Sequence, residues 1–295
     1  MVFAGHTSLP RRQLGQFVRR QREANTSFTQ EAVAKAMQWS HSRYARFERG
    51  EPGKVLDRDL VELGKILEIP DHEVAAMIEL ARQVAEKTWY NPYNDLIRAN
   101  LDVYMRLETD ARSMEIWRPD LVPGLLQTAD YAAALNRIHF PKESEEEHER
   151  RIELKMQRQK ILTRKKSAVT VDLILHECVL HTIVGSEAIT AAQCRHLADM
   201  STQPNISIRI LPFKAGFPLG TPVGPFVILD FEPKPNGVAE PTVVYVENYS
   251  GDMYLEEETD VELHRRASAT IQHTALDAVA SRALLRQVAR KDSRQ

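Results

Sequence analysis

Apolar residues recur at helical spacing through the first 80 or so residues of the chain. Leu14, Phe17 and Val18 share one side of a predicted helix from about Arg11 to Ala24, which leaves its arginines on the outer side. Four shorter helices follow, and each begins near a residue that suits an N-cap, namely Thr29, Ser40, Asp57 and Asp71. The pattern therefore predicts an all-α N-terminal domain of five helices.

The predicted helix after Ser40 has two different sides. Tyr44 and Phe47 face inward, whereas the outer side carries polar and basic residues, which are His41, Ser42, Arg43 and Arg46. Gly50 ends the helix, because glycine readily adopts the left-handed conformation that stops helices. The outer side is thus available to a ligand.

Beyond residue 95 the pattern mixes strands and helices. Apolar and polar residues alternate in 169–175 and 206–210, 113–117 is extended, and the more continuously apolar 226–231 and 243–247 suggest interior strands. Two pairs with the spacing of a capping box, Ser144 with Glu147 and Thr190 with Gln193, predict helix starts between these strands. We predict an α+β domain with a mainly antiparallel sheet.

A short aromatic segment separates the two regions. Residues 87–95 contain a proline together with Trp89, Tyr90 and Tyr93. We therefore predict two domains, residues 1–90 and residues 95–295. The aromatic residues either pack at the junction, or Trp89 and Tyr93 bind a partner or ligand there, since ligand sites often lie between domains.

Charge is distributed unevenly along the 295 residues. The net charge is −2, yet residues 1–60 contain 11 lysines and arginines against 6 acidic residues, a local +5. Nucleic-acid binding needs such a local basic surface rather than a basic whole. The chain has only two cysteines, no signal-peptide pattern and no apolar stretch that could cross a bilayer, so we expect a cytoplasmic protein without a membrane partner.

Two segments carry a family resemblance. Residues 29–34 read Thr-Gln-Glu-Ala-Val-Ala, and residues 40–50 read Ser-His-Ser-Arg-Tyr-Ala-Arg-Phe-Glu-Arg-Gly. Together they resemble the helix-turn-helix of Xre-family, phage-repressor-like regulators, over roughly residues 11–70. This family often has a glycine in the turn, where this chain has Gln38 beside the bulky Trp39.

The resemblance implies a double-stranded DNA partner and a role for each outer residue. Gln30 would bind a phosphate and brace the recognition helix, which begins after Ser40. His41, Ser42 and Arg43 would contact bases. Arg46, Arg49 and Lys54 would lie near the DNA backbone. A pair of such domains implies a homodimer on a near-palindromic operator. The alternative is a helical bundle whose charges merely face water.

The second region resembles another family. Its segments are Val122-Pro123-Gly124-Leu125-Leu126-Gln127-Thr128, Tyr131-Ala132, Arg158-Gln159, Ile210-Leu211-Pro212 with Ala215-Gly216, and Val244-Tyr245-Val246-Glu247. In this order they are similar to the C-terminal domain of unknown function that accompanies Xre modules in actinobacterial WhiJ-like and antitoxin-like regulators, over roughly residues 98–288. The resemblance implies a small partner protein encoded nearby, or a small-molecule effector. Val122, Pro123, Leu125 and Leu126 would either pack inside the domain or present a docking surface.

Other groups of residues offer little chemistry. His176 and His181 are five residues apart, which does not place them on one face of a helix as a zinc protease requires. We predict no metal, no cofactor and no catalytic residue, because the sequence contains no nucleophile with its base and no phosphate-binding glycine loop. The hypotheses are a DNA-binding regulator, such as a repressor, modulated through its C-terminal domain; an antitoxin that also represses its own operon; and, third, an enzyme fused to a DNA-binding module.

Overall fold

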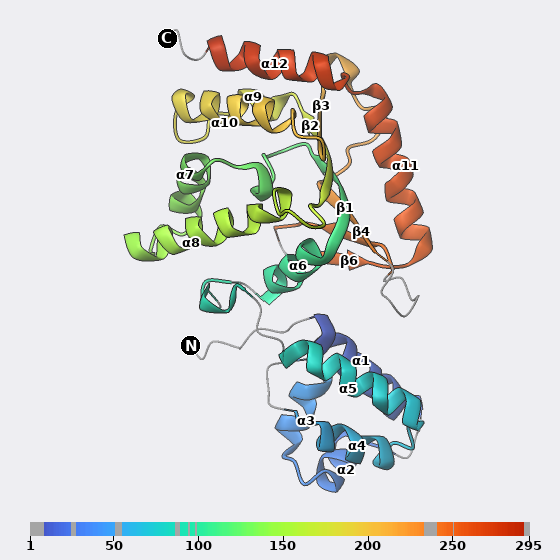
Figure 1. The fold of residues 1–295 in the computed structure, drawn as a ribbon. Coiled ribbons are helices and arrows are strands. Elements are labelled where there is room, and N and C mark those ends of the chain that lie inside the picture. Colours follow the sequence, from blue (N-terminus) through green and yellow to red (C-terminus); the bar gives the residue numbers. More distant parts are fainter. Residues whose placement is uncertain are drawn as a thin grey trace. The chain divides into compact units, whose positions relative to one another are not determined.

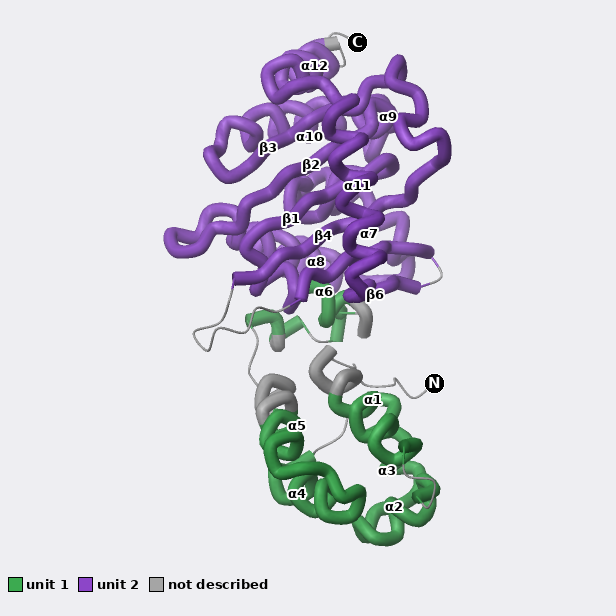
Figure 2. Tube along the Cα trace, turned by 90° about the vertical axis from the view of Figure 1, so that its right-hand side faces the viewer, with its two compact units in different colours: residues 1–105 green, residues 106–295 purple. Residues whose placement is uncertain are grey.

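The structure is a computed structural model, and it describes residues 9–24, 28–50, 55–85, 89–93, 95–97, 99–232, 241–249 and 251–291. The chain divides into two compact units, residues 1–105 and residues 106–295, which are coloured separately in Figure 2.

Five helices form the first part of the N-terminal unit, as the sequence predicts (Figure 1). They are α1 (Leu9–Ala24), α2 (Gln30–Ala36), α3 (His41–Glu48), α4 (Asp57–Ile66) and α5 (Asp71–Ala85). A 3-10 turn, η1 (Asn91–Tyr93), and the start of α6 (Ala99–Asp110) follow. Two of the predicted N-caps are confirmed: the Thr29 hydroxyl accepts from the Ala32 N–H, and the Ser40 hydroxyl accepts from the Arg43 N–H.

The helices of this unit enclose one apolar core. It contains Leu14 and Val18 of α1, Val33 and Ala34 of α2, Tyr44 and Phe47 of α3, Leu60 and Leu63 of α4, and Val74 and Met77 of α5. Gly15 lets α1 approach closely, because a Cβ built there would lie 2.6 Å from the Phe47 carbonyl oxygen and 2.7 Å from that of Glu48. The backbone at the end of α3 therefore rests directly on α1.

The second unit is built around a six-stranded sheet. Its strands are β1 (Ala111–Arg118), β2 (Thr170–His176), β3 (Ile206–Leu211), β4 (Phe226–Phe231), β5 (Val243–Val246) and β6 (Met253–Leu255), in the order β3-β2-β1-β4-β5-β6. Its helices after α6 are α7 (Ala129–His139), α8 (Glu145–Arg158), α9 (Cys178–His181), α10 (Glu187–Met200), α11 (Glu258–Thr274) and α12 (Ala278–Lys291), with 3-10 turns η2 (Gly124–Leu126), η3 (Gln159–Leu162) and η4 (Phe213–Ala215).

The prediction of a mainly antiparallel sheet is wrong, because the sheet is mixed. β1, β2 and β3 are parallel to one another, and the pairs β1–β4, β4–β5 and β5–β6 are antiparallel. Parallel neighbours need a long crossover, which the helices between β1 and β2 and between β2 and β3 provide. The α+β character of the unit and the interior places of β4 and β5 agree with the prediction.

Helices lie on both sides of this sheet. Figure 1 shows α11 along one face and α7, α8 and α10 on the other side. Ile271 of α11 packs with Trp117, Phe226 and Val244 of the sheet in one apolar cluster. None of the helices in the described part of the chain combines the length and the apolar run that crossing a bilayer requires.

Candidate nucleic-acid interface

Helix α3 separates its side chains as the sequence predicts. Tyr44, Ala45, Phe47 and Glu48 are buried, and Tyr44 is completely inaccessible. The predicted DNA-contacting residues Ser40, His41, Ser42, Arg43, Arg46 and Arg49 are all exposed. The fold therefore presents these six predicted residues to solvent on one short segment. Lys54 lies outside the described residues.

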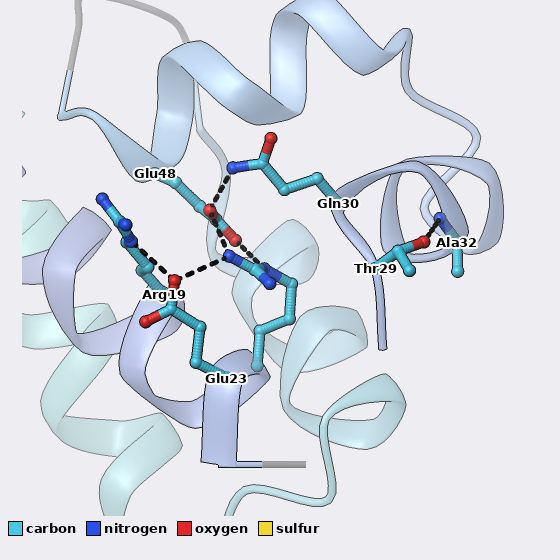
Figure 3. A network of polar contacts seen from close by, with 7 residues as sticks. Arg19, Glu23, Thr29, Gln30, Ala32 and Glu48 are labelled. Atoms are coloured by element: carbon cyan, nitrogen blue, oxygen red, sulfur yellow. Dashed lines mark hydrogen bonds and ion pairs between the residues drawn. The ribbon is translucent and has the colours of Figure 1, made fainter. Parts of the chain in front are cut away.

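A buried ion pair fixes the end of α3 against α1. Arg22 forms two bonds to Glu48: its Nε lies 2.6 Å from Oε1 and its Nη2 lies 3.1 Å from Oε2. The side chains are 11% and 1% exposed, respectively. Gln30 of α2 donates a third bond, from Nε2 to Oε2 of Glu48, at 2.6 Å (Figure 3). One carboxylate thus ties the first three helices together.

The protonation of Glu48 follows from these contacts. Burial by itself raises the pKa of this carboxyl, but the bonds from Arg22 and Gln30 outweigh burial and hold the pKa below its ordinary value. Glu48 is therefore ionised at neutral pH and balances the Arg22 charge. Sequence reasoning missed this pair, although the signal was present: Glu48 follows Tyr44 by four residues and so shares its inward side.

This bond joins the first residue of α2 to α3, and the helix-turn-helix resemblance predicts that Gln30 braces the recognition helix. Its side chain is half-buried at the first residue of α2. The resemblance also implies that the Gln30 side-chain amide contacts a DNA phosphate, and this role stays a prediction.

The turn between α2 and α3 adopts the geometry that glycine would favour. Gln38 has a φ of +55°, in the left-handed region. Its N–H donates to the Lys35 carbonyl at 3.1 Å, and the Trp39 N–H donates to the Ala34 carbonyl at 2.8 Å, which together form the paired bonds of a Schellman cap. The departure from glycine at this position therefore leaves the turn conformation in place and adds backbone strain.

In the second unit, the four residues predicted either to dock a partner or to pack inside are buried. Val122, Pro123, Leu125 and Leu126 lie in the interior around η2, so they do not form an exposed docking surface. Side chains from distant helices hold this segment. Gln193 of α10 accepts from the Thr128 N–H at 2.7 Å and donates to the Leu126 carbonyl at 2.6 Å, and Gln159 donates to the carbonyls of Gly124 and Gln127.

These contacts also correct one predicted helix start. Thr190 and Gln193 do not form a capping box, because α10 begins earlier, with the Ser186 hydroxyl accepting from the Ile189 N–H. Thr190 and Gln193 are buried one turn and two turns further on, and the packing of residues 122–128 uses the amide of Gln193. The box of Ser144 and Glu147 is confirmed at the start of α8.

Two protein families match this chain, one in each region. Residues 13–77 match a family described as helix-turn-helix domain, and residues 101–287, more than half of the chain, match one described as domain of unknown function (DUF5753). The chain belongs to the DUF5753 family. No curated protein and no solved structure matches it. A helix-turn-helix at residues 13–77 contains α2, the turn and α3, which are the elements that position the predicted DNA contacts.

Within the DUF5753 domain, the His176 to His181 segment is a junction between β2 and α9. The Cys178 N–H donates to Nδ1 of His176 at 3.2 Å, the Cys178 thiol donates to the Pro119 carbonyl, and the His181 ring stacks on Phe213. Among the residues that the structure describes, no group of three or more His, Cys, Asp and Glu side chains is arranged to hold a metal ion.

The aromatic segment that precedes the DUF5753 domain forms a local cluster. The rings of Trp89 and Tyr90 meet edge to face, with centroids 5.3 Å apart. Tyr90 and Tyr93 are buried, whereas Trp89 remains 39% exposed. Contact of Trp89 and Tyr93 with a partner or ligand stays a prediction.

Proposed function

We propose that this chain is a sequence-specific, double-stranded DNA-binding regulator of the Xre type and that α3 is its recognition helix. In this proposal α3 enters the major groove, His41, Ser42 and Arg43 reach base edges, and Arg46 and Arg49 contact phosphates. Gln30 and Lys54 add phosphate contacts from the neighbouring segments, as the resemblance implies. Two chains bind as a homodimer to a near-palindromic operator.

One observation carries this proposal: α3 buries Tyr44 and Phe47, whereas α3 and the two residues that cap it expose the six predicted contacts. The local charge supports it, because residues 1–60 carry +5 in a chain of net charge −2. The match of residues 13–77 to a helix-turn-helix domain supports DNA as the partner.

The test is DNA selection followed by a salt titration. The full-length protein is used to select sites from random duplexes, and its affinity for the best site is measured from low to high salt. Because each phosphate contact releases counterions, the affinity should fall steeply, and Arg46→Ala and Arg49→Ala should each reduce the slope of log affinity against log salt by about 1.

The matched control is Arg286→Ala, which removes an exposed arginine from α12 in the DUF5753 domain. It changes the net charge by the same amount and should leave the slope unchanged. The proposal fails if the wild-type protein selects no sequence and binds no duplex at low salt. The recognition-helix assignment alone fails if Arg46→Ala and Arg49→Ala bind DNA as Arg286→Ala does.

We further propose that the DUF5753 domain modulates operator binding when it engages a small partner protein encoded nearby, or a small-molecule effector, and that the chain is not an enzyme. The proposal rests on the size of a domain that DNA binding alone does not need. The test is copurification of the product of an adjacent small reading frame, with operator affinity measured in its presence. Toxicity of that product, relieved by this chain, would favour the antitoxin alternative; copurification without a change in affinity would contradict modulation by that partner.

A further inference from the structure

Trp39 lies in the turn before the proposed recognition helix, where both its backbone and its ring make contacts. The backbone N–H of Trp39 donates a 2.8 Å hydrogen bond to the Ala34 carbonyl. Its indole packs partly buried against the core of the helix-turn-helix unit and meets the Phe47 ring edge to face, with centroids 5.8 Å apart and an interplanar angle of 85°. Both the backbone and the ring of Trp39 therefore have defined positions.

Arg43 lies against this ring. Its guanidinium carbon is 3.9 Å from the centroid of the Trp39 ring, within the range of a cation–π contact. A guanidinium can contact a ring through its flat face while the N–H groups at its edge serve as hydrogen-bond donors. The Arg43 side chain is 44% exposed, so solvent reaches part of it.

Asp59 of α4 restrains the same guanidinium from another element. Its Oδ2 lies 3.6 Å from Nη2 of Arg43. Asp59 is itself fixed, because the same oxygen accepts from the Leu56 N–H at 3.0 Å at the start of α4. The predicted base-reading arginine is therefore placed by two residues that belong to different elements.

We propose that Trp39 and Asp59 are positioning residues that hold Arg43 in a preformed conformation for reading one guanine in each half-site. This inference rests on the proposed function. A planar guanidinium recognises guanine by donating two bonds to O6 and N7, which requires a defined orientation of its edge. A long arginine that is already oriented loses less conformational freedom on binding, which is worth about tenfold in affinity for the preferred base.

The contact can be tested without DNA. In the free full-length protein, the Nε–H signal of Arg43, identified by its loss in Arg43→Lys, should be displaced upfield by the ring current of Trp39. The displacement should disappear in Trp39→Leu and persist in part in Trp39→Phe, which keeps an aromatic face. An Arg43 signal that is the same in wild type and Trp39→Leu would overturn the proposal.

The specificity is tested by DNA selection with the same variants. Arg43→Ala should abolish the preference for guanine at one position of each half-site. Trp39→Leu should weaken that preference about tenfold and leave the preferences at other positions unchanged, and Trp39→Phe should restore most of it. The double variant Trp39→Leu with Arg43→Ala should lose no more guanine preference at that position than Arg43→Ala alone, because the two residues act as one unit.

The outcomes separate this inference from the proposed function. If Arg43→Ala loses the guanine preference while Trp39→Leu and Asp59→Asn both keep it, Arg43 reads the base unaided and the positioning role is overturned. If Arg43→Ala leaves every preference unchanged, the inference fails while DNA binding stands. If the wild-type protein selects no site, the proposed function fails first. Trp39→Leu is not informative if it lowers the protection of amides in α2 and α3, because the turn itself is then disturbed. In that case Trp39→Phe and Asp59→Asn test the positioning role. Asp59→Asn should weaken the guanine preference about threefold.

Discussion

Neutralising Glu48 tests the role of the buried ion pair directly. Glu48→Gln preserves the shape of the side chain but removes its charge and replaces one acceptor oxygen with an NH₂ group that faces donors. Three bonds end on this carboxylate, two from Arg22 and one from Gln30. A hydrogen bond to a charged group is worth about 1 kcal/mol more than one between neutral groups, so the loss is about 3 kcal/mol. This agrees with the lower end of the cost of breaking a buried pair, about 3–5 kcal/mol.

Hydrogen exchange is the suitable assay, because it reports on each unit separately in the full-length chain. The opening free energy of amides in α1, α2 and α3 should fall by about 3 kcal/mol in Glu48→Gln, while that of amides in β1 and β2 should not change. Glu23→Gln is the matched control. It neutralises a surface glutamate, 48% exposed, that pairs with Arg19 and also lies 3.4 Å from Nη2 of Arg22. Because these pairs are open to solvent, the opening free energies should change far less than in Glu48→Gln.

Acid should erase the difference between the two proteins. The folded pKa of Glu48 lies below its ordinary value, so its contribution is complete above the unfolded pKa of about 4.3 and is lost as the pH falls through the folded pKa. The wild-type advantage over Glu48→Gln should therefore shrink only below about pH 4. Equal opening free energies in Glu48→Gln and Glu23→Gln at pH 7 would refute the assignment of the carboxylate as the tie between the first three helices.

Three further predictions concern the backbone and a half-buried lysine. Gln38→Gly should raise the unfolding free energy of the N-terminal unit by about 1 kcal/mol, because it relieves the left-handed strain at φ +55°, whereas Gln38→Ala should not; urea titration compares the two. Gly15→Ala should lower the unfolding free energy of the same unit by about 1–3 kcal/mol, since the new Cβ would meet the Phe47 carbonyl oxygen at 2.6 Å. An unchanged melting temperature would contradict this close packing. Burial lowers the pKa of Lys155 to about 8, so protonation opposes folding below that value. The stability of the DUF5753 domain should therefore rise between pH 8 and pH 10, by at most about 3 kcal/mol, and Lys155→Met should flatten this rise.

The local features of the helix-turn-helix were readable from the sequence. The caps at Thr29 and Ser40, the inward side of α3 and its exposed polar side all follow from spacing, because each depends on residues within one or two helical turns. The same holds for the Ser144 capping box and for the positions of β1 to β5 in the second unit, whereas the short edge strand β6 was not predicted.

Contacts between distant segments were decided only by the tertiary structure. The direction of β1 relative to β2 depends on the path of the intervening helices, and a strand pattern is the same in a parallel and an antiparallel pair. Gln193 fits a capping pattern in the sequence, yet its amide bonds to the backbone at residues 126 and 128. Arg22 and Glu48 are 26 positions apart and resemble surface charges until the fold buries them together. Periodicity along the chain fixes which side of an element is apolar, but only packing in three dimensions determines which polar groups are removed from water and must therefore find partners.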